Sequence, residues 1–368
     1  MKKNDSQKSK IFPKYLIITL GCISGLLWYA TGYASYNIVY QAYQLRMQGM
    51  ADSARTILET SLVEDSTNAA VWYEYARTKH QIGLGNPHEL FAGLDDLQRA
   101  IKKAIDIHPD NVIYAYYNGY ICFTQAYLSL MRDPTNARGK VGEAVSAYEL
   151  VLKLKPDYKE AMLTLVEVLA LPEDMGGNSS KAQTYADKLD ILDPIYGAKA
   201  RELLLPDSVN KVEFWQGILE TYPDHPDILE QLGKAYLYTE NADQGLLYLE
   251  DAIKIDPGKK LLLLDMARFH FMTSRKDTSM ARNALPRAED TIKSYLDTNP
   301  IAPLHAFAVN MLAMIKFSQG LSNEGKEYQR QAKNIDPNVS QASAIPPAVL
   351  FEKPNQISHY FSYFFRPF

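Results

Sequence analysis

One spacing recurs along this chain and constrains its fold more than any other feature. A small residue is followed by an apolar residue four positions later, another residue three positions on, and a proline five further. Gly245, Leu249, Ala252 and Pro257 form one copy. Steps of four and three place residues on one face of a helix, and a following proline ends that helix. Eight copies, the first closing at Ser66 and the last at Pro337, predict a repeat array, whose function lies on a surface rather than in one catalytic pocket.

A first helix precedes the closing helix in each repeat. The clearest copy has an apolar stripe at positions i, i+3, i+4 and i+7, formed by Leu229, Leu232, Gly233 and Tyr236. A polar turn at 240–243 joins this stripe to the helix that ends at Pro257. The pattern resembles the tetratricopeptide repeat, and the resemblance covers residues 35–338. It implies an all-α fold, a tetratricopeptide-type α-solenoid of about eight helix pairs, preceded by an N-terminal apolar helix.

The closing positions are unevenly spaced, which indicates insertions within some repeats. The three longest insertions cover residues 83–93, 132–140 and 273–286. Insertions in a solenoid usually lie in loops at one edge, where binding surfaces are often built. We therefore expect loops at these places. The copy that ends at Pro223 is short, and one interpretation is a degenerate helix pair.

The composition argues against several classes of function. The net charge is −4 with no basic stripe, so nucleic acid is not an expected partner. The seven histidines show no metal-ligand spacing, and no glycine-rich loop leads into Lys-Ser or Lys-Thr. Glu160 and Glu167 are the best candidate acid pair, but salt bridging or solvation is the better explanation, because carboxylates on helices are common and no companion residue supports catalysis. We expect neither an enzyme nor a bound cofactor or metal.

The N-terminal region has the pattern of an export segment. Residues 1–14 carry five lysines, and residues 15–34 form a 20-residue apolar stretch without charge. This length suits a membrane-spanning helix, and the preceding lysines predict that the repeats lie on the non-cytoplasmic side. A cleaved signal ending at Ala34, with a secreted product, is the first alternative. A lipoprotein modified at Cys22 is the second.

The C-terminal region departs from the repeat pattern. Residues 339–368 are rich in proline and aromatic residues, and the last ten include six aromatic side chains. This tail either folds back onto the repeats or docks on a partner or membrane face. Cys122, in a tyrosine-rich helix, is expected to be a small buried hydrophobic residue.

The resemblance also implies where a partner binds. The first helix of each tetratricopeptide repeat lines the concave side, and here that face is rich in tyrosine and arginine, which are enriched at the energetic centres of interfaces. The candidate partner-binding residues are Tyr43, Arg46, Tyr73, Arg77, Tyr116, Tyr120, Phe123, Tyr238, Arg268 and Phe271. The alternative is that the tyrosines only pack between adjacent repeats.

One loop suggests a second kind of function. Residues 171–178 read Leu-Pro-Glu-Asp-Met-Gly-Gly-Asn, in which the proline stops a helix, the glycines allow positive φ, and Asn178 can cap the next helix. Similar loops occur in exported tetratricopeptide proteins, including some that accompany solute transporters.

The sequence thus predicts an exported, membrane-anchored scaffold that binds a protein or peptide partner of the membrane or cell envelope on its concave face. The alternative is a ligand-handling accessory protein of a solute transporter. On the first hypothesis, replacing Tyr116 and Tyr120 with alanine abolishes partner capture and leaves helical content intact.

Overall fold

The computed structural model describes residues 37–85, 87–132, 134–277 and 279–339, all in helices, turns and loops. The predicted basic segment 1–14, apolar span 15–34 and tail after residue 339 lie outside these residues. The described residues form eight helix pairs, as predicted. The pairs are residues 37–47 with α2 (Ala51–Glu64), α3 (Ala69–Leu84) with α4 (Pro87–Ile107), α5 (Val112–Arg132) with α6 (Pro134–Leu154), α7 (Lys159–Leu169) with α8 (Ser179–Leu192), α9 (Pro194–Leu204) with α10 (Lys211–Thr221), α11 (Pro226–Tyr236) with α12 (Ala242–Ile255), α13 (Leu262–Lys276) with α14 (Ala281–Leu296), and α15 (Ala302–Ser318) with α16 (Ser322–Ile335).

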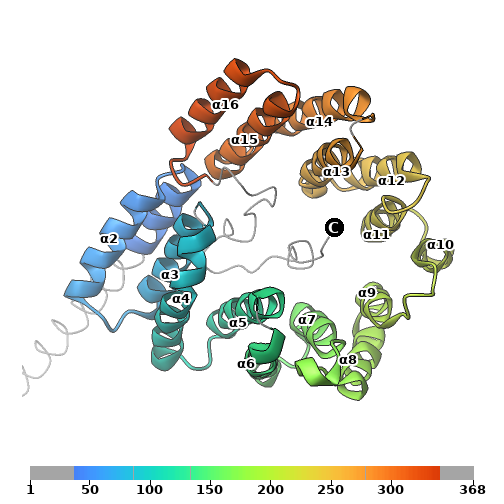
Figure 1. Ribbon diagram of the computed structural model, residues 1–368. Helices are drawn as coiled ribbons and strands as arrows, with labels where there is room; N and C mark the ends of the chain where they lie inside the picture. Colours follow the sequence, from blue (N-terminus) through green and yellow to red (C-terminus); the bar gives the residue numbers. More distant parts are fainter. Residues whose placement is uncertain (1–36, 86, 133, 278, 340–368) are drawn as a thin grey trace, which may run out of the picture.

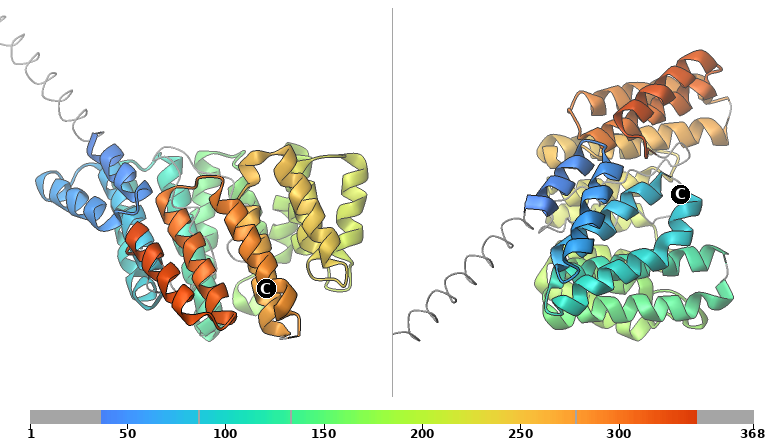
Figure 2. Two further views of the ribbon diagram at one scale, coloured as in Figure 1. Left: turned by 90° about the horizontal axis from the view of Figure 1, so that it is seen from above. Right: turned by 90° about the vertical axis from the view of Figure 1, so that its left-hand side faces the viewer.

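The pairs stack in chain order and curve into a ring (Figure 1). From α5 onward the odd-numbered helices line the inside of the ring and the even-numbered helices form its outer layer. Seen edge-on, the helices stand side by side around a single wall (Figure 2). Each helix packs mainly on its neighbours in sequence, which is the contact pattern of a repeat array.

The small and proline positions of the repeat have the predicted roles. A Cβ atom at Gly245 of α12 would lie 2.6 Å from the carbonyl oxygen of Gly233 of α11, so the small residues allow the two helices to approach closely. The outer helices end just before the closing prolines, as α12 does at Ile255 before Pro257. The short copy before Pro223 is a complete pair of two 11-residue helices, α9 and α10, and is therefore not degenerate.

The expected insertion loops are largely absent from the described residues, and this prediction was wrong. Residues 83–93 and 132–140 instead extend α4, α5 and α6, each of which has 21 residues. Pro87 and Pro134 begin helices rather than end them, because a proline in the first helical turn gives up no hydrogen bond. The third insertion contains only a short connection, and Pro286 lies inside α14.

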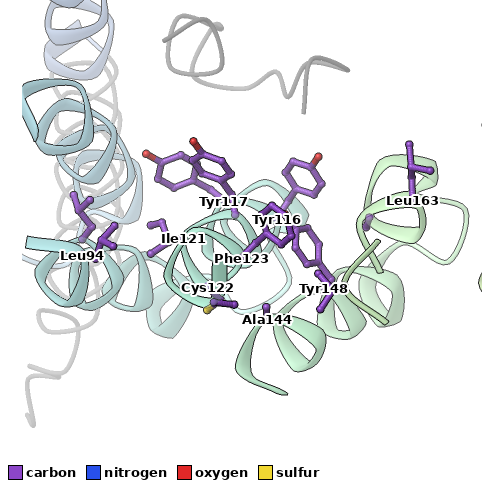
Figure 3. Close-up of a cluster of buried hydrophobic side chains, with 14 of the residues drawn as sticks. Leu94, Tyr116, Tyr117, Ile121, Cys122, Phe123, Ala144, Tyr148 and Leu163 are labelled. Atoms are coloured by element: carbon purple, nitrogen blue, oxygen red, sulfur yellow. The ribbon is translucent and has the colours of Figure 1, made fainter. Parts of the chain in front are cut away.

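Tyrosine and small residues share the core of the third repeat. A Cβ atom at Gly119 of α5 would lie 3.0 Å from the ring of Tyr148 of α6, so the glycine makes room for that ring. Figure 3 shows Cys122 on the side of α5 that faces Ala144, while Tyr116 and Tyr117 extend from the other side. Cys122 is 2% exposed, as predicted, and its Sγ accepts a hydrogen bond from Gln98.

The two ends of the described array meet. Asn338, which follows α16, donates a side-chain hydrogen bond to Asp52 of α2 at 2.9 Å. A Cβ atom at Gly49 would overlap the carbonyl oxygen of Ile335, and one at Gly85 would overlap that of Asn338. The right-hand view of Figure 2 shows α2 and α3 beside α16. The solenoid is therefore closed on itself.

A membrane-spanning helix is not found between residues 37 and 339, where each described helix is too short or too polar to cross a bilayer. The predicted anchor at 15–34 lies outside this part of the chain and stays a prediction.

Candidate functional site

The inner face near the closure contains a buried ionic network. Arg46 Nε donates to Glu74 Oε1 at 2.7 Å, and Arg46 Nη1 donates to Gln81 Oε1 at 3.1 Å. Arg77 Nη1 lies 3.8 Å from Glu74 Oε2. Arg46, Glu74 and Arg77 are at most 2% exposed. Glu74 thus joins the first two repeats by contacting two guanidinium groups, and burial of such a pair is tolerated only because both ions are hydrogen-bonded or paired.

An aromatic cluster adjoins this network. His80 Nδ1 and the hydroxyl oxygen of Tyr117 are 3.0 Å apart, and the ring of Tyr120 lies 5.4 Å from that of His80. Tyr73 packs against Tyr117 with ring centroids 5.5 Å apart. Burial, and then the charges of the two nearby arginines, lower the pKa of His80 to about 4. The imidazole is therefore neutral at physiological pH and serves as a packing and hydrogen-bonding group.

A second aromatic cluster joins the third and fourth repeats. Tyr116 stacks on Tyr158 with ring centroids 4.9 Å apart and meets Tyr148 edge-on at 5.7 Å. Tyr116 and Tyr148 are each at most 1% exposed. Helices α5 and α6 and the residue that precedes α7 thus contact one another through these rings, of which the sequence predicted only Tyr116 for the concave face.

The ten predicted groove residues fall into two groups by exposure. One group is buried and consists of Arg46, Tyr73, Arg77, Tyr116, Tyr120, Phe123 and Phe271. In the other group, Tyr238 is 62% exposed, and Tyr43 and Arg268 are half-buried. Packing between repeats, the alternative that the sequence left open, accounts for the ring contacts of Tyr73, Tyr116 and Tyr120. A direct partner contact by the buried group stays a prediction.

Tyr238 and Arg268 belong to consecutive repeats, and the stacking of these repeats brings the two residues near each other. Tyr238 follows α11, and Arg268 lies on α13. Burial lowers the pKa of Arg268, and the nearby Asp265 and Tyr238 oppose that shift. This accessible tyrosine beside a half-buried arginine has the chemistry of an interface anchor.

Sequence reasoning missed a set of ion pairs that joins α9, α11 and the segment after α12. Asp227 Oδ2 lies 2.7 Å from Lys199 Nζ, and Lys259 Nζ lies 2.8 Å from Glu230 Oε2. Glu230 also pairs with Lys234. Burial alone would raise the pKa of Asp227, but Lys199 and Lys259 lower it, so the carboxyl is ionised at neutral pH. Each charge is ordinary in the sequence, and only the stacking of repeats brings them together.

The loop at 171–178 has the turn chemistry that the sequence predicted. Gly176 has φ of 101°, and the Asn178 side chain accepts a hydrogen bond from the backbone N–H of Lys181 at the start of α8. A Cβ atom at Gly177 would overlap the carbonyl oxygen of Leu171. The loop is therefore explained by its own geometry.

One member of the candidate acid pair, Glu160, makes a structural contact. The hydroxyl of Tyr196 donates to Glu160 Oε1 at 2.9 Å, which ties α7 to α9. Across the residues that the structure describes, histidine, cysteine and carboxylate side chains form no group of three that could hold a metal ion.

Comparison with protein families identifies two repeats directly. The family described as tetratricopeptide repeat matches residues 226–259 and 308–339. The first segment contains α11 and α12, and the second covers the C-terminal part of α15 and all of α16. Comparison with curated protein sequences found no significant match.

Several solved structures have a similar arrangement of helices at low sequence identity. The crystal structure of MamA is 18% identical, with 59% of this chain and 94% of that chain covered and a TM-score of 0.29. The human IFIT1 dimer with PPP-AAAA is 15% identical, with 83% and 85% covered and a TM-score of 0.36. The APC/C hetero-tetramer Cut9–Hcn1 has a chain that is 16% identical, with 82% and 53% covered and a TM-score of 0.34. We draw no functional conclusion from similarities at this level.

The repeat pattern, the helix pairs and the family match agree. The chain therefore contains tetratricopeptide repeats. Proteins of this class are protein–protein interaction scaffolds, because stacked helix pairs present extended surfaces to partners.

Proposed function

We propose that this chain is an exported, membrane-anchored scaffold that binds a protein partner on the inner face of its ring. The observation that carries the proposal is the convergence of the candidate residues. Helices α5, α11 and α13, which are far apart in the sequence, line one central face of the closed ring (Figure 1). The partner contacts the accessible side chains, such as Tyr238, and the buried aromatic and ionic clusters fix the shape of the face beneath them.

Photo-crosslinking in intact cells tests this assignment. A photoreactive amino acid replaces Tyr238 in one variant and Val63 in a control variant. Val63, on the outer helix α2, is 87% exposed, so both positions are accessible but lie on different faces. The proposal expects one partner to be captured from position 238 only. Equal capture from both positions, or capture from position 63 alone, contradicts it.

The location of the protein is a separate part of the proposal and rests on the N-terminal sequence. With residues 15–34 in the bilayer, the described array begins only a few residues beyond the span, so the ring stays close to the membrane. A membrane or envelope partner follows from that proximity. Protease accessibility of the repeats from the non-cytoplasmic side supports export. An intact N-terminus distinguishes an anchor from a signal cleaved after Ala34.

The ligand-handling alternative makes a different prediction. A transporter accessory of that kind increases its melting temperature when its solute is added, because binding to the folded state stabilises it. Thermal melting with and without a panel of candidate solutes therefore separates the two functions.

A further inference from the structure

A polar pocket lies between α12, α13 and α14. It has a volume of about 450 Å³. Leu246, Met266 and His270 line it and are at most 6% exposed. The volume lies within the range of small-ligand sites, roughly 300–1,000 Å³. The pocket is thus large enough for a side chain together with some of the backbone that carries it.

The rim of the pocket is acidic. Asp243, Glu250 and Asp290 contribute three carboxylates, and Arg287 contributes one guanidinium. Arg287 is already paired with Asp243 at 2.9 Å. Glu250 and Asp290 form no ion pair with any residue that the structure describes. An excess of negative charge therefore remains at the mouth.

His270 gives an independent indication of a ligand. It is 94% buried and lines the pocket, and neither of its ring nitrogens is hydrogen-bonded to any described residue. Burial and the nearby Arg287 lower the pKa of His270 to about 4, so its ring is neutral and keeps one donor and one acceptor nitrogen. A ligand in the pocket can therefore hydrogen-bond to a ring nitrogen of His270.

The geometry of the lining residues argues against a metal ion as the occupant of the pocket. The rim carboxylates do not converge with His270 into a group that could hold a metal ion, and the same holds for every such group among the described residues. An elongated organic cation fits better, because its charged end reaches the separated carboxylates while its apolar part lies on Leu246 and Met266. Leu247, 52% exposed on the rim, offers further apolar contact.

We propose that this pocket binds a basic side chain, arginine or lysine, of a protein partner. The aliphatic stem packs on Leu246 and Met266, the charged group pairs with Glu250 and Asp290, and His270 accepts a hydrogen bond from it. Most of the lining comes from the outer helices α12 and α14, and it includes none of the candidate residues of the inner face, so the two proposals are tested separately.

The test uses the full chain and small probes of the side chain alone. N-acetylarginine N-methylamide and N-acetyllysine N-methylamide are titrated into the millimolar range while the imidazole NMR signals of His270 are followed. His270→Gln assigns those signals by their loss. N-acetylcitrulline N-methylamide, which has the shape of arginine without its charge, is the neutral control.

The proposal expects saturable shifts with at least one basic probe and much weaker binding of the citrulline probe. The Glu250→Gln, Asp290→Asn double variant should weaken binding of the basic probe roughly three- to tenfold. The Asp187→Asn, Asp251→Asn double variant removes two exposed carboxylates that do not line the pocket, and it should bind as the unchanged protein does. Equal binding of the citrulline probe, an equal loss in both double variants, or no saturable shift with either basic probe overturns the proposal.

Discussion

Asn338 and Asp52 are 286 positions apart, yet the Asn338 side-chain amide donates a 2.9 Å hydrogen bond to the Asp52 carboxylate. This bond joins the segment after the last outer helix to the first outer helix. It forms because the small rotation between successive repeats adds up to nearly a full turn over eight pairs. The ring closure that it marks has consequences for stability that can be measured.

Gly85 should be essential for the closure. Its backbone is in the αR region, so alanine is locally tolerated, but a Cβ atom would overlap the carbonyl oxygen of Asn338. We expect Gly85→Ala to lower the free energy of unfolding by about 1–3 kcal/mol and to increase the radius of gyration. Chemical denaturation and small-angle X-ray scattering measure the two effects.

Gly142→Ala is the matched control, because a Cβ atom at Gly142 of α6 would meet no atom within 4 Å. This variant should be neutral or stabilised by up to about 1 kcal/mol, since alanine restricts the unfolded chain. Indistinguishable behaviour of the two variants would contradict the close approach at Gly85.

Asp336 should make the closure sensitive to pH. Its side chain is 3% exposed and accepts hydrogen bonds from Gln81 and from the backbone N–H of Asn338. Asp52 lies nearby, and Arg46 is hydrogen-bonded to Gln81. Burial first, and then the Asp52 charge, raise the pKa of Asp336 to about 6. The folded form thus holds this proton more tightly than the unfolded form. The contribution is present below the unfolded pKa, about 4, and is lost as pH rises through about 6.

The measurement is the free energy of unfolding from pH 4 to pH 7 for the unchanged chain and Asp336→Asn. We expect the difference between the two free energies of unfolding to change by on the order of 1–3 kcal/mol over this interval. The unchanged chain should lose stability relative to Asp336→Asn as pH rises. Parallel pH profiles would show that Asp336 titrates normally.

Tyr116 and Tyr238 should differ sharply in their contribution to stability. Tyr116 is 1% exposed and stacked on Tyr158, so Tyr116→Ala leaves a cavity and should cost about 3–5 kcal/mol. Tyr238→Ala should cost less than about 0.5 kcal/mol, because the side chain is 62% exposed. Denaturation followed by circular dichroism compares the two. A similar cost for both variants would contradict the packing described for Tyr116.

The burial of Tyr116 also changes how partner binding must be tested. Loss of capture after Tyr116→Ala would not separate binding from folding, contrary to the expectation that helical content stays intact. Tyr238 is the better position for a binding variant.

His80 and His270 should remain neutral throughout the physiological range. Burial lowers the pKa of each to about 4, with nearby arginines adding to the shift. Their imidazole NMR signals should not titrate between about pH 5.5 and 8. His80→Gln and His270→Gln assign the signals, and a midpoint near the ordinary value of about 6.5 for either residue would contradict its burial.

The local pattern of the sequence predicted the helix pairs well and their wider arrangement poorly. Gly245 and Pro257 mark a close approach and a helix end because those effects act within one repeat. Residues 83–93 and 132–140 were misread as loops, although Pro87 and Pro134 suit the start of a helix. The Asp52–Asn338 contact was not predictable, because closure depends on small rotations summed over the whole array.

The sequence predicted which helices carry the candidate site but did not predict how deeply its residues are buried. Repeat register indicates which residues point inward, but it does not show that Arg46 and Arg77 are buried against Glu74. The three-residue spacing of Glu74 and Arg77 was the one available signal. The Lys199–Asp227 pair and the outer pocket join separate repeats, so no spacing within a repeat reveals them.

Closure of the ring is tested most directly by the distance between two spin labels across the joint. The labels are attached at Ser53 on α2 and Asn334 on α16, both exposed, after Cys22 and Cys122 are replaced by serine and alanine. Pulsed electron–electron double resonance on the full chain should give one short, narrow distribution of label-to-label distances. This distribution should broaden in the Gly85→Ala variant. A long or broad distribution in the chain with Gly85 intact would show an open solenoid and contradict the closed ring.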